Sequence, residues 1–208
     1  MLFVFDNNIF DYGYATLERF FQLAPWILLL LIPAITMRSF ADEFKAGTYE
    51  VLQTRPLSRG QIITGKYLGS LTVVLIALLT TIVYVFSIQR LSSHEGIDTG
   101  ATIGSYIGLL FLAAAFTAIG ICASSSTNNS VVAFILSLIG CALLYYGFSA
   151  ISRLPGLSGK GDYYVEMIGI DFHYRSVSRG VLDTRDIVYF FTIVILFLSI
   201  TSRNLLKR

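Results

Sequence analysis

The sequence predicts an all-α, polytopic integral membrane helix bundle with about five complete transmembrane helices. The chain has 208 residues, of which 55% are hydrophobic, 14% aromatic and only 13% charged. Soluble domains carry about 25% charged residues, so the shortage of charge argues against a soluble protein. The apolar residues gather in blocks close to the ~20 residues that a helix needs to cross the hydrocarbon layer. The predicted spans cover residues 20–36, 67–88, 102–123, 131–151 and 187–202, within a single transmembrane domain of residues 1–208.

The first five residues and two prolines allow predictions about the start of the chain. Residues 1–5 resemble the last turns of an apolar helix, so we expect that a further span is missing before the first complete one. Pro25 is expected in the first turn of the 20–36 span, where its missing N–H group costs little. Pro33 lies inside that span and is expected to kink it, which frees a carbonyl group one turn earlier.

Polar residues predict where the fourth and fifth spans begin. Asn129 or Ser130 is expected to cap the N-terminus of the fourth span, because both side chains accept hydrogen bonds from free backbone N–H groups. Asp183 and Asp186 have the spacing of a cap and a third helical residue at the start of the last span, where negative charge is favourable.

The third span carries small residues at every fourth position. Gly104 and Gly108 have GxxxG spacing, and Ala114 and Ala118 continue the spacing further along the helix. Small residues at this interval let helix backbones approach closely in a bilayer. We favour packing within the bundle over a dimer interface for these four residues.

A polar segment of residues 38–66 separates the first two spans. Gly47 can end the helix that leaves the first span, and Thr48 can start a short helix of about residues 49–54. Pro56 cannot continue a helix. Ser58 and Gln61 have the spacing of a capping box, which predicts that the next helix starts there and runs into the membrane.

The short helix is expected to make contacts with another molecule. Its apolar contact points are Tyr49, Val51 and Leu52, and the segment's charged groups are Glu50, Arg55 and Arg59. Short loops rich in Lys and Arg stay on the cytoplasmic side. The 38–66 segment and the C-terminus together hold eight such residues, against two in the short loops of the opposite side. The segment is therefore predicted to be cytoplasmic, and residues 152–186 extracytoplasmic.

The 152–186 region is rich in charge. Its charged residues, which can form internal ion pairs in a compact cap, are Asp171, Arg175, Arg179, Asp183, Arg185 and Asp186. One interpretation is an extracytoplasmic gate that uses Arg175, Arg179, Asp183 and Arg185. The other is a solvated loop that anchors the last helix, and the sequence leaves both open.

The sequence shows no motif for catalysis, for a cofactor or for a metal. The stretch LSGKG at residues 157–161 lacks the spacing of a nucleotide-binding P-loop, and the motifs H-E-x-x-H and G-x-S-x-G are missing. Cys122 and Cys141 lie in apolar spans and are not spaced as a metal pair. His94 and His173 are expected to be solvated loop residues. A formal charge of +2 is too small to imply a nucleic-acid partner.

The predicted spans are nearly free of charged residues, so they lack the ionisable groups that ion-coupled transporters normally need. A transporter built from these spans would have to receive its energy through a loop. A few polar residues could line a translocation surface or only satisfy neighbouring backbone groups: Thr80, Thr81, Ser137, Tyr145 and Tyr146.

The stretch GTYEVLQTRPLSRGQIITGKYLG resembles the cytoplasmic segment of ABC-2 type permeases. With APWILLLLIPAITMRSFADE before it and SVSRGVLDTRDIVYFF near the end, the chain is most similar to gliding-motility-associated (GldF-like) permeases. In that family the short helix is the coupling helix, which seats in a cleft of the ATP-binding subunit, and six spans are usual. The resemblance implies that coupling to the ATPase uses Gly47, Thr48, Glu50, Leu52, Arg55 and Pro56.

The resemblance also implies a function. We expect a permease subunit in a bacterial inner membrane that couples ATP hydrolysis by a separate ABC ATP-binding subunit to export or to the gliding-motility machinery. The expected partners are that ATPase, a second permease copy or a related membrane subunit, and the lipid bilayer. The chain itself would not be an enzyme. Glu50→Arg or Leu52→Asp should then uncouple ATP hydrolysis from transport. The alternative is a non-transporting membrane scaffold or assembly factor.

Overall fold

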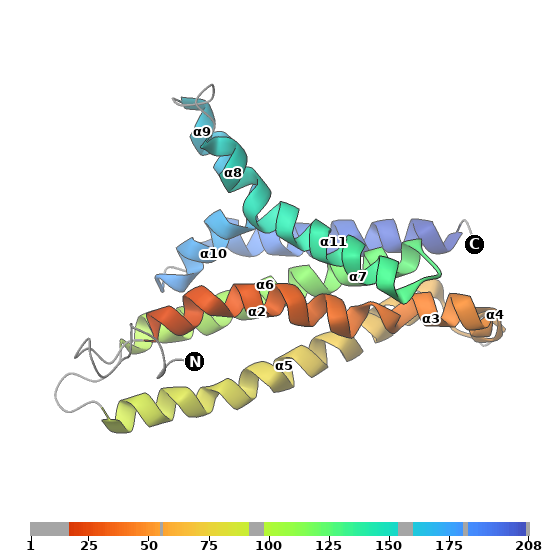
Figure 1. Ribbon diagram of the computed structural model, residues 1–208, viewed down its shortest axis with the longest axis horizontal. Helices are drawn as coiled ribbons and strands as arrows, with labels where there is room; N and C mark the ends of the chain where they lie inside the picture. Colours follow the sequence, from red (N-terminus) through yellow and green to blue (C-terminus); the bar gives the residue numbers. More distant parts are fainter. Residues whose placement is uncertain (1–16, 55, 92–97, 154–159, 181–182, 207–208) are drawn as a thin grey trace.

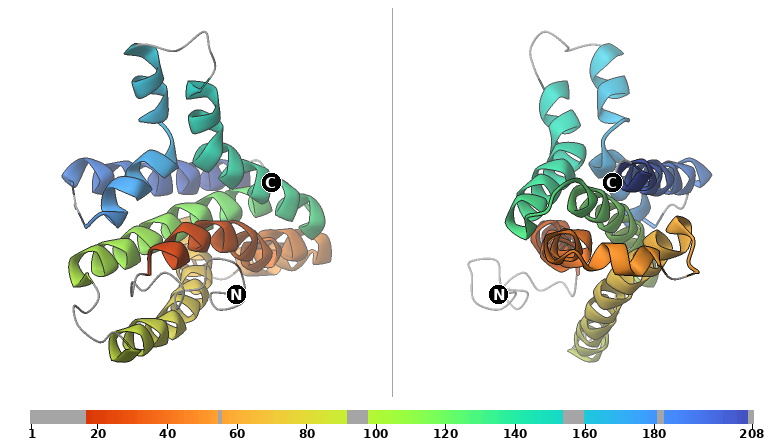
Figure 2. Two further views of the ribbon diagram at one scale, coloured as in Figure 1. Left: turned by 60° about the vertical axis from the view of Figure 1, so that its left-hand side comes forward. Right: turned by 90° about the vertical axis from the view of Figure 1, so that its right-hand side faces the viewer.

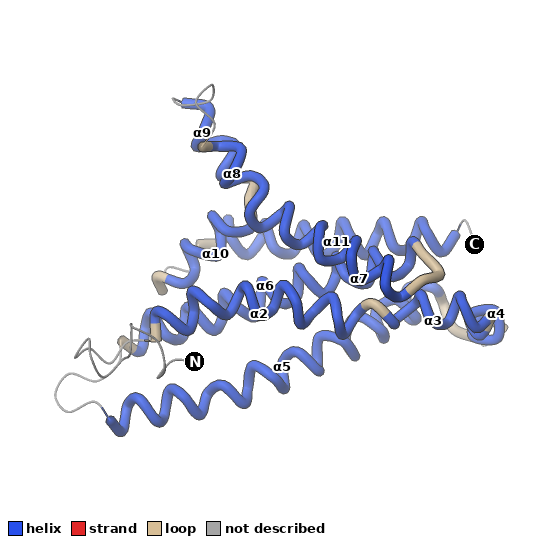
Figure 3. The backbone as a smooth tube through the Cα atoms, viewed as in Figure 1, coloured by secondary structure: helices blue, strands red, loops and turns tan. Residues whose placement is uncertain are grey.

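The computed structural model describes residues 17–54, 56–91, 98–153, 160–180 and 183–206, and every regular element in these ranges is a helix. Figure 1 labels the elements, and Figure 3 shows the helices joined by mostly short loops. In chain order they are α2 (Glu18–Thr36), α3 (Arg38–Ala46), α4 (Thr48–Gln53), α5 (Arg59–Leu91), α6 (Thr99–Ser126), α7 (Ser130–Ala142), the π-helical turn η1 (Leu143–Gly147), α8 (Phe148–Ser152), α9 (Lys160–Glu166), α10 (Ile170–Ser178) and α11 (Thr184–Leu206).

Five helical stretches of the described residues are long and apolar enough to cross a membrane. They are Glu18–Ala46, Arg59–Arg90, Thr99–Ser126, Ser130–Ser152 and Thr184–Leu206. This confirms the predicted all-α polytopic bundle with five spans. The helical stretches extend beyond the predicted apolar blocks, by as much as the ten residues that separate Thr36 from Ala46. Residues 1–5, which we interpreted as the end of a further span, lie outside the described residues.

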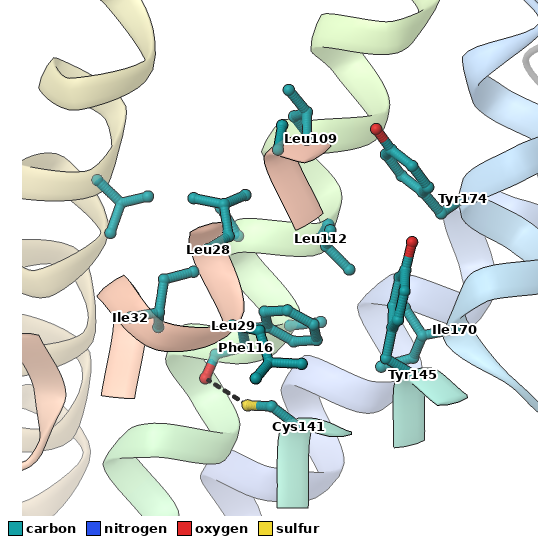
Figure 4. Packing of buried hydrophobic residues seen from close by; sticks show 14 of the residues in the cluster. Leu28, Leu29, Ile32, Leu109, Leu112, Phe116, Cys141, Tyr145, Ile170 and Tyr174 are labelled. Atoms are coloured by element: carbon teal, nitrogen blue, oxygen red, sulfur yellow. Dashed lines mark hydrogen bonds between the residues drawn. The ribbon is translucent and has the colours of Figure 1, made fainter. Parts of the chain in front are cut away.

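Helix α6 is the centre of the bundle. In the most apolar 18-residue stretch of α6, 78% of the residues are buried inside the bundle, whereas the corresponding share for α5 is 11%. Helices α2, α3, α5, α7, α10 and α11 all pack against α6. Figure 4 shows the core that results, in which Leu109, Leu112 and Phe116 of α6 lie beside Leu28 and Ile32 of α2.

Helix α5 leaves the bundle. Its backbone lies close to the other helices near its start and diverges from them toward Leu91, as Figures 1 and 2 show. Side chains in its second half still reach the bundle: the Tyr84 ring lies 6.0 Å from the Phe20 ring. Its outward side chains are apolar and exposed, among them Ile76 at 57%, Val83 at 62% and Phe86 at 65%. Apolar exposure of this extent suits contact with lipid.

The prediction for Pro25 was wrong, because α2 begins at Glu18 and places this proline in the helix interior. A proline there cannot donate to the carbonyl four residues earlier, which is that of Phe21. The Tyr174 hydroxyl of α10 donates to that carbonyl oxygen at 2.8 Å. A tertiary contact thus replaces the missing helical hydrogen bond. Pro33 is interior as predicted, and α2 gives way to α3 one turn later, at Met37.

The fourth span contains a feature that the sequence did not predict. Its α-helical hydrogen bonding is interrupted by η1, and α8 then points away from the bundle and lies beside α9 (Figure 2). Single π-helical turns inside helices often occur at functional positions. The turn carries Tyr145 and Tyr146, whose side chains reach the cavity described below.

Several predicted helix starts and ends are confirmed. Gly47 ends α3 in the left-handed conformation, with φ of 69°, which favours glycine because it has no Cβ atom. Ser58 and Gln61 form the capping box, with the Ser58 N–H donating to Oε1 of Gln61 at 2.8 Å and the Gln61 N–H donating to Oγ of Ser58 at 3.3 Å. Asn129 caps α7 by accepting from the Val131 N–H at 2.9 Å, and Asp183 accepts from the Arg185 N–H at 3.0 Å.

Candidate functional site

The predicted functional residues lie at opposite ends of the bundle's long axis (Figure 1). We call the region of α3, α4 and the first turns of α5 the α4 end. We call the region of α10, η1 and the starting turns of α2, α6 and α11 the α10 end.

At the α4 end, α4 rests on an aromatic base. Tyr49 is buried with 5% exposure, and its ring packs edge-on against Phe44, with ring centroids 5.0 Å apart, and against Phe40 at 6.3 Å. Ile62, Ile121 and other apolar residues of α5, α6 and α11 complete this second core. Tyr49 therefore holds α4 to the bundle and does not face outward as a contact point.

Lys66 clamps α3 to α5. Its ammonium Nζ lies 2.6 Å from Oε1 of Glu43 and donates to the Ser39 carbonyl oxygen at 2.6 Å. The same group lies 4.9 Å from the centroid of the Phe40 ring. Because the two side chains of the ion pair are only 19% and 31% exposed, water screens this contact less than it screens a pair on an open surface.

Ser124 of α6 joins the start of α3 to the centre of the bundle. Its fully buried Oγ accepts from the N–H groups of Phe40 and Ala41 at 3.0 and 3.2 Å and donates to the Met37 carbonyl oxygen at 2.9 Å. Backbone groups that the break at Met37 leaves without helical partners are thereby satisfied. The clamp and this contact hold the segment that carries α4 at a fixed position.

The outward face of α4 is small and mixed in character. Glu50 is exposed, Val51 is 63% exposed, and Leu57 just after the helix is 48% exposed. Leu52 is half-buried against the second core. Of the other predicted coupling residues, Gly47, Thr48 and Pro56 are exposed, and Arg55 lies outside the described residues. Of the three apolar contact points that the sequence predicted on α4, Val51 is therefore the one that is exposed.

At the α10 end, Gly104 of α6 lies against the end of α10. A Cβ atom on Gly104 would come within 2.6 Å of the Gly180 Cα and 2.8 Å of the Val177 carbonyl oxygen, and one on Gly108 would touch the Tyr174 ring at 3.4 Å. Both glycines thus face a helix of their own chain. Ala118 is buried, and the Ala114 carbonyl oxygen accepts from the Tyr67 hydroxyl at 3.3 Å.

The charges of the 152–186 region do not form the compact cap that we expected. Arg175 pairs with Asp171 and lies 3.9 Å from Glu166, and the hydrogen bond with Asp171 raises the pKa of Arg175 above its ordinary value. Arg179, Asp183 and Arg185 are exposed and make no ion pair with the residues that the structure describes. Arg179 and Arg185 line two different cavities.

His173 contradicts the expectation of a solvated histidine. It is 3% exposed, its Nδ1 lies 2.6 Å from Oδ1 of Asp186, and its Nε2 lies 2.9 Å from the Met167 carbonyl oxygen. The Tyr189 ring stacks on the imidazole with centroids 3.9 Å apart. Asp186 therefore ties α11 to α10 with its side chain, besides lying in the first helical turn as predicted. His94 lies outside the described residues.

A cavity of about 690 Å³ opens at the α10 end. Its walls come from the starts of α2 and α6, from η1, from the residue after α8 and from one face of α10. Tyr145 and Tyr146 are the two predicted translocation-surface residues that reach it. Thr80 and Thr81 donate instead to carbonyl oxygens of their own helix, at 2.7 and 2.6 Å, and Ser137 is buried between helices.

Within the described ranges, no group of three His, Cys, Asp or Glu side chains is arranged to hold a metal ion. Cys122 and Cys141 are free and buried. Lys66, Ser124 and His173 were not among the predicted functional residues, and each acts through a partner on another helix. No local sequence signal marks such contacts.

Comparison with known proteins gives one family. A family model described as ABC-2 family transporter protein matches residues 7–157 of the chain. The matched region includes the whole α4 end and helices α2 to α8. No curated protein shows significant similarity to the chain.

Proposed function

Because this chain belongs to the ABC-2 family of transporter membrane proteins, we propose that it is the permease subunit in which α4 receives the motion of a separate ATP-binding subunit. The family consists of membrane components of ABC transporters, which in general work with an ABC ATP-binding subunit. Beyond membership of the family, we propose where the coupling site lies in the chain, on which side of the membrane it lies, and in which cellular process the transporter acts.

The α4 end carries the proposal. A helix that transmits force must present a contact face and must be firmly attached to the spans that it moves. Glu50, Val51 and Leu57 supply the exposed face. Tyr49 and the Lys66 clamp attach α4 to spans of the bundle. Both requirements are met in one segment of about thirty residues, the length of the polar region 38–66.

The orientation follows from charge. Lys and Arg flank the α4 end more densely than the short loops of the other side. We therefore propose that α4 faces the cytoplasm of a bacterial cell and that the α10 end faces outward. A second permease copy or a related subunit would complete the transport path. The flanking sequences that resemble gliding-motility permeases support export or a surface-machinery role.

The α10 end supports a gate in this arrangement. Arg175 and Arg179 both line the cavity there, whereas Arg185 faces a separate groove beside Tyr189. We accordingly place the gate at the cavity with Arg175 and Arg179, and give Asp183 the role of helix cap.

Cysteine labelling tests the orientation. The native cysteines are buried, so Val51→Cys and Tyr164→Cys, at positions 63% and 69% exposed, each introduce one accessible thiol. A membrane-impermeant maleimide added to intact cells should label Tyr164→Cys, and should label Val51→Cys only after the membrane is opened. Labelling of Val51→Cys from outside would refute the proposed coupling site.

Coupled ATP hydrolysis tests the function itself. The chain is reconstituted with its ATP-binding subunit, and the ATPase activity that depends on the chain is measured. Val51→Asp or Glu50→Arg should lower that activity at least tenfold, because a buried, unpaired charge is costly at an interface. The matched control is Val131→Asp, which changes an equally exposed valine, also 63%, at the start of α7.

Other results of this assay would lead to different conclusions. Leu52→Asp also perturbs the second core, so its loss of coupling is interpreted only beside a measured melting temperature. Normal coupling in both Val51→Asp and Glu50→Arg contradicts the assignment of α4. If the unmodified chain neither binds an ATP-binding subunit nor alters its activity, a non-transporting scaffold or assembly factor is the better description.

A further inference from the structure

The cavity at the α10 end has the architecture of a ligand site. It measures about 690 Å³, within the range of about 300–1,000 Å³ that is usual for small-molecule pockets. Five elements of the chain build it, so it is not a groove beside a single helix. Glycines at positions 104 and 108 let α10 lie close to α6, and α10 carries the charged residues of the wall.

The interior surface of the cavity is aromatic. Tyr145 and Tyr174 are each 4% exposed, and Phe21 is 7% exposed. Figure 4 shows Tyr145 and Tyr174 near Ile170, on the same side of the core. The Tyr174 hydroxyl is already used by the Phe21 carbonyl oxygen, and burial raises the pKa of Tyr174 above its ordinary value. Tyr145 and Tyr174 are thus packed into the wall and leave little ring surface free, whereas the half-buried Tyr146 keeps part of its ring accessible. An accessible aromatic ring suits a ring or a chain as the body of a ligand.

Each carboxylate that lines the cavity accepts a hydrogen bond. Asp171 is 6% exposed and is bound by the Arg175 guanidinium and the Ser149 hydroxyl. Asp98 caps α6 by accepting from the Ala101 N–H at 3.0 Å. Glu18 lies in the first turn of α2, where it accepts from the Gln22 amide at 3.1 Å. The positive end of a helix dipole offsets part of the charge of Asp98 and of Glu18.

Two arginines of the wall have no carboxylate partner among the described residues. Arg153 follows α8 and Arg179 follows α10, and both line the cavity. Neither makes an ion pair with the residues that the structure describes. A guanidinium group binds carboxylate and phosphate through two parallel hydrogen bonds, so these two side chains form an anion-attracting rim above an aromatic interior.

We propose that this cavity binds an amphiphilic anion, with a phosphate or carboxylate group at Arg153 and Arg179 and an apolar body against the accessible part of the Tyr146 ring. A lipid headgroup and a soluble aromatic phosphate share this chemistry. The proposed binding of an anion does not depend on the proposed coupling to an ATPase. Only the statement that the cavity faces outward rests on the orientation proposed above.

The single tryptophan of the chain reports on the cavity. Trp26 is the only tryptophan, and its ring lies 4.5 Å from the ring of Tyr146, which lines the cavity. The purified chain in a neutral detergent is titrated with phenyl phosphate, phenyl glucoside and phenyltrimethylammonium while Trp26 emission is recorded. These probes share one ring and differ in charge. We expect saturable binding of phenyl phosphate, at least tenfold tighter than that of the neutral and cationic probes, and weaker at high salt.

Variants test the two arginines. Arg153→Gln combined with Arg179→Gln should weaken phenyl phosphate binding about tenfold, and Arg153→Lys combined with Arg179→Lys should retain most of it. The control Arg185→Gln removes an exposed arginine outside this cavity and should leave affinity unchanged. Single Arg153→Glu and Arg179→Glu variants, at exposed positions that leave the core intact, should each weaken binding as well.

Each outcome decides the proposal. Equal binding of the three probes, or an affinity that the arginine variants do not change, overturns it. Dihexanoyl phosphatidate distinguishes the sources, because tighter binding than phenyl phosphate identifies a lipid and weaker binding identifies a soluble anion. ATP and the ATPase are absent from the assay, so its failure leaves the α4 proposal standing, and failure of coupling leaves the cavity proposal standing.

Discussion

The two ends of this bundle use polar residues in opposite ways. At the α4 end, Lys66 and Ser124 point inward and hold the backbone of α3, and a short helix presents its exposed face outward. At the α10 end, Arg153 and Arg179 line a cavity, while the buried pair of His173 and Asp186 secures the neighbouring helix. One end is arranged to be held rigidly, and the other surrounds an open volume.

The difference shows where movement is compatible with the fold. Tyr49 ties α4 to the second core, and the Lys66 clamp and the Ser124 contacts tie α3 to α5 and α6. We therefore expect α4 and the adjoining ends of α2 and α5 to move as one body. The α10 end has unfilled space next to helix starts, where side chains can rearrange with less loss of packing. Four substitutions test this contrast, in order of decreasing effect on stability.

The largest effect is expected from Asp186→Ala. Removing the Asp186 carboxylate leaves a buried ring nitrogen of His173 without its hydrogen-bond partner, which costs up to about 3 kcal/mol, and the two side chains are 4% and 5% exposed. For a chain of this size, such a loss lowers the melting temperature by about 6–12 °C, which thermal unfolding in detergent micelles would show. The neighbouring Arg185→Ala, at an exposed position, should shift it little. Similar shifts in both variants would mean that the pair does not secure α11.

Gly104→Ala should have the next largest effect. The added Cβ would meet backbone atoms of Gly180 and Val177 at 2.6 and 2.8 Å, and overpacking of this kind costs about 1–3 kcal/mol. Gly69→Ala on α5 is the matched control, because a Cβ there meets nothing within 4 Å and alanine favours the helix. The melting temperature should fall for the first variant and stay or rise for the second. Equal tolerance of both would show that α6 and α10 are not in close contact.

Lys66→Met should destabilise the α4 end by about 1 kcal/mol, a value reduced because both partners retain some contact with water. A double-mutant cycle with Glu43→Gln isolates the ion pair from the contact with the Ser39 carbonyl oxygen. If the two substitutions are additive, the ion pair contributes nothing, and the aromatic base and the Ser124 contacts hold the segment without it.

The smallest effect on stability is expected from Val51→Asp. Its side chain is 63% exposed, and surface substitutions usually stay within about 0.5 kcal/mol. Leu52→Asp, one residue later, places a charge against the second core and should lower the melting temperature more. The reverse order would mean that α4 is rotated relative to the arrangement described here.

Much of the architecture could be read from short stretches of sequence. The five spans follow from the length of apolar blocks, and Gly47, Ser58 with Gln61, and Asn129 mark helix ends through groups only a few residues apart. Where the local signal was ambiguous the prediction failed, as for Pro25, because nothing near that residue showed that α2 starts at Glu18.

The sequence by itself therefore determined the five spans found in the described residues and the presence of a short helix between the first two of them. The tertiary structure decided which faces meet: Ser124 contacts a backbone N–H 84 residues away, and Tyr174 completes a hydrogen bond 153 residues away. In a soluble helix an apolar stripe shows which side is buried. In a membrane the lipid-facing and protein-facing sides are both apolar, so only packing distinguishes the central α6 from the peripheral α5 and assembles the cavity from five separate elements.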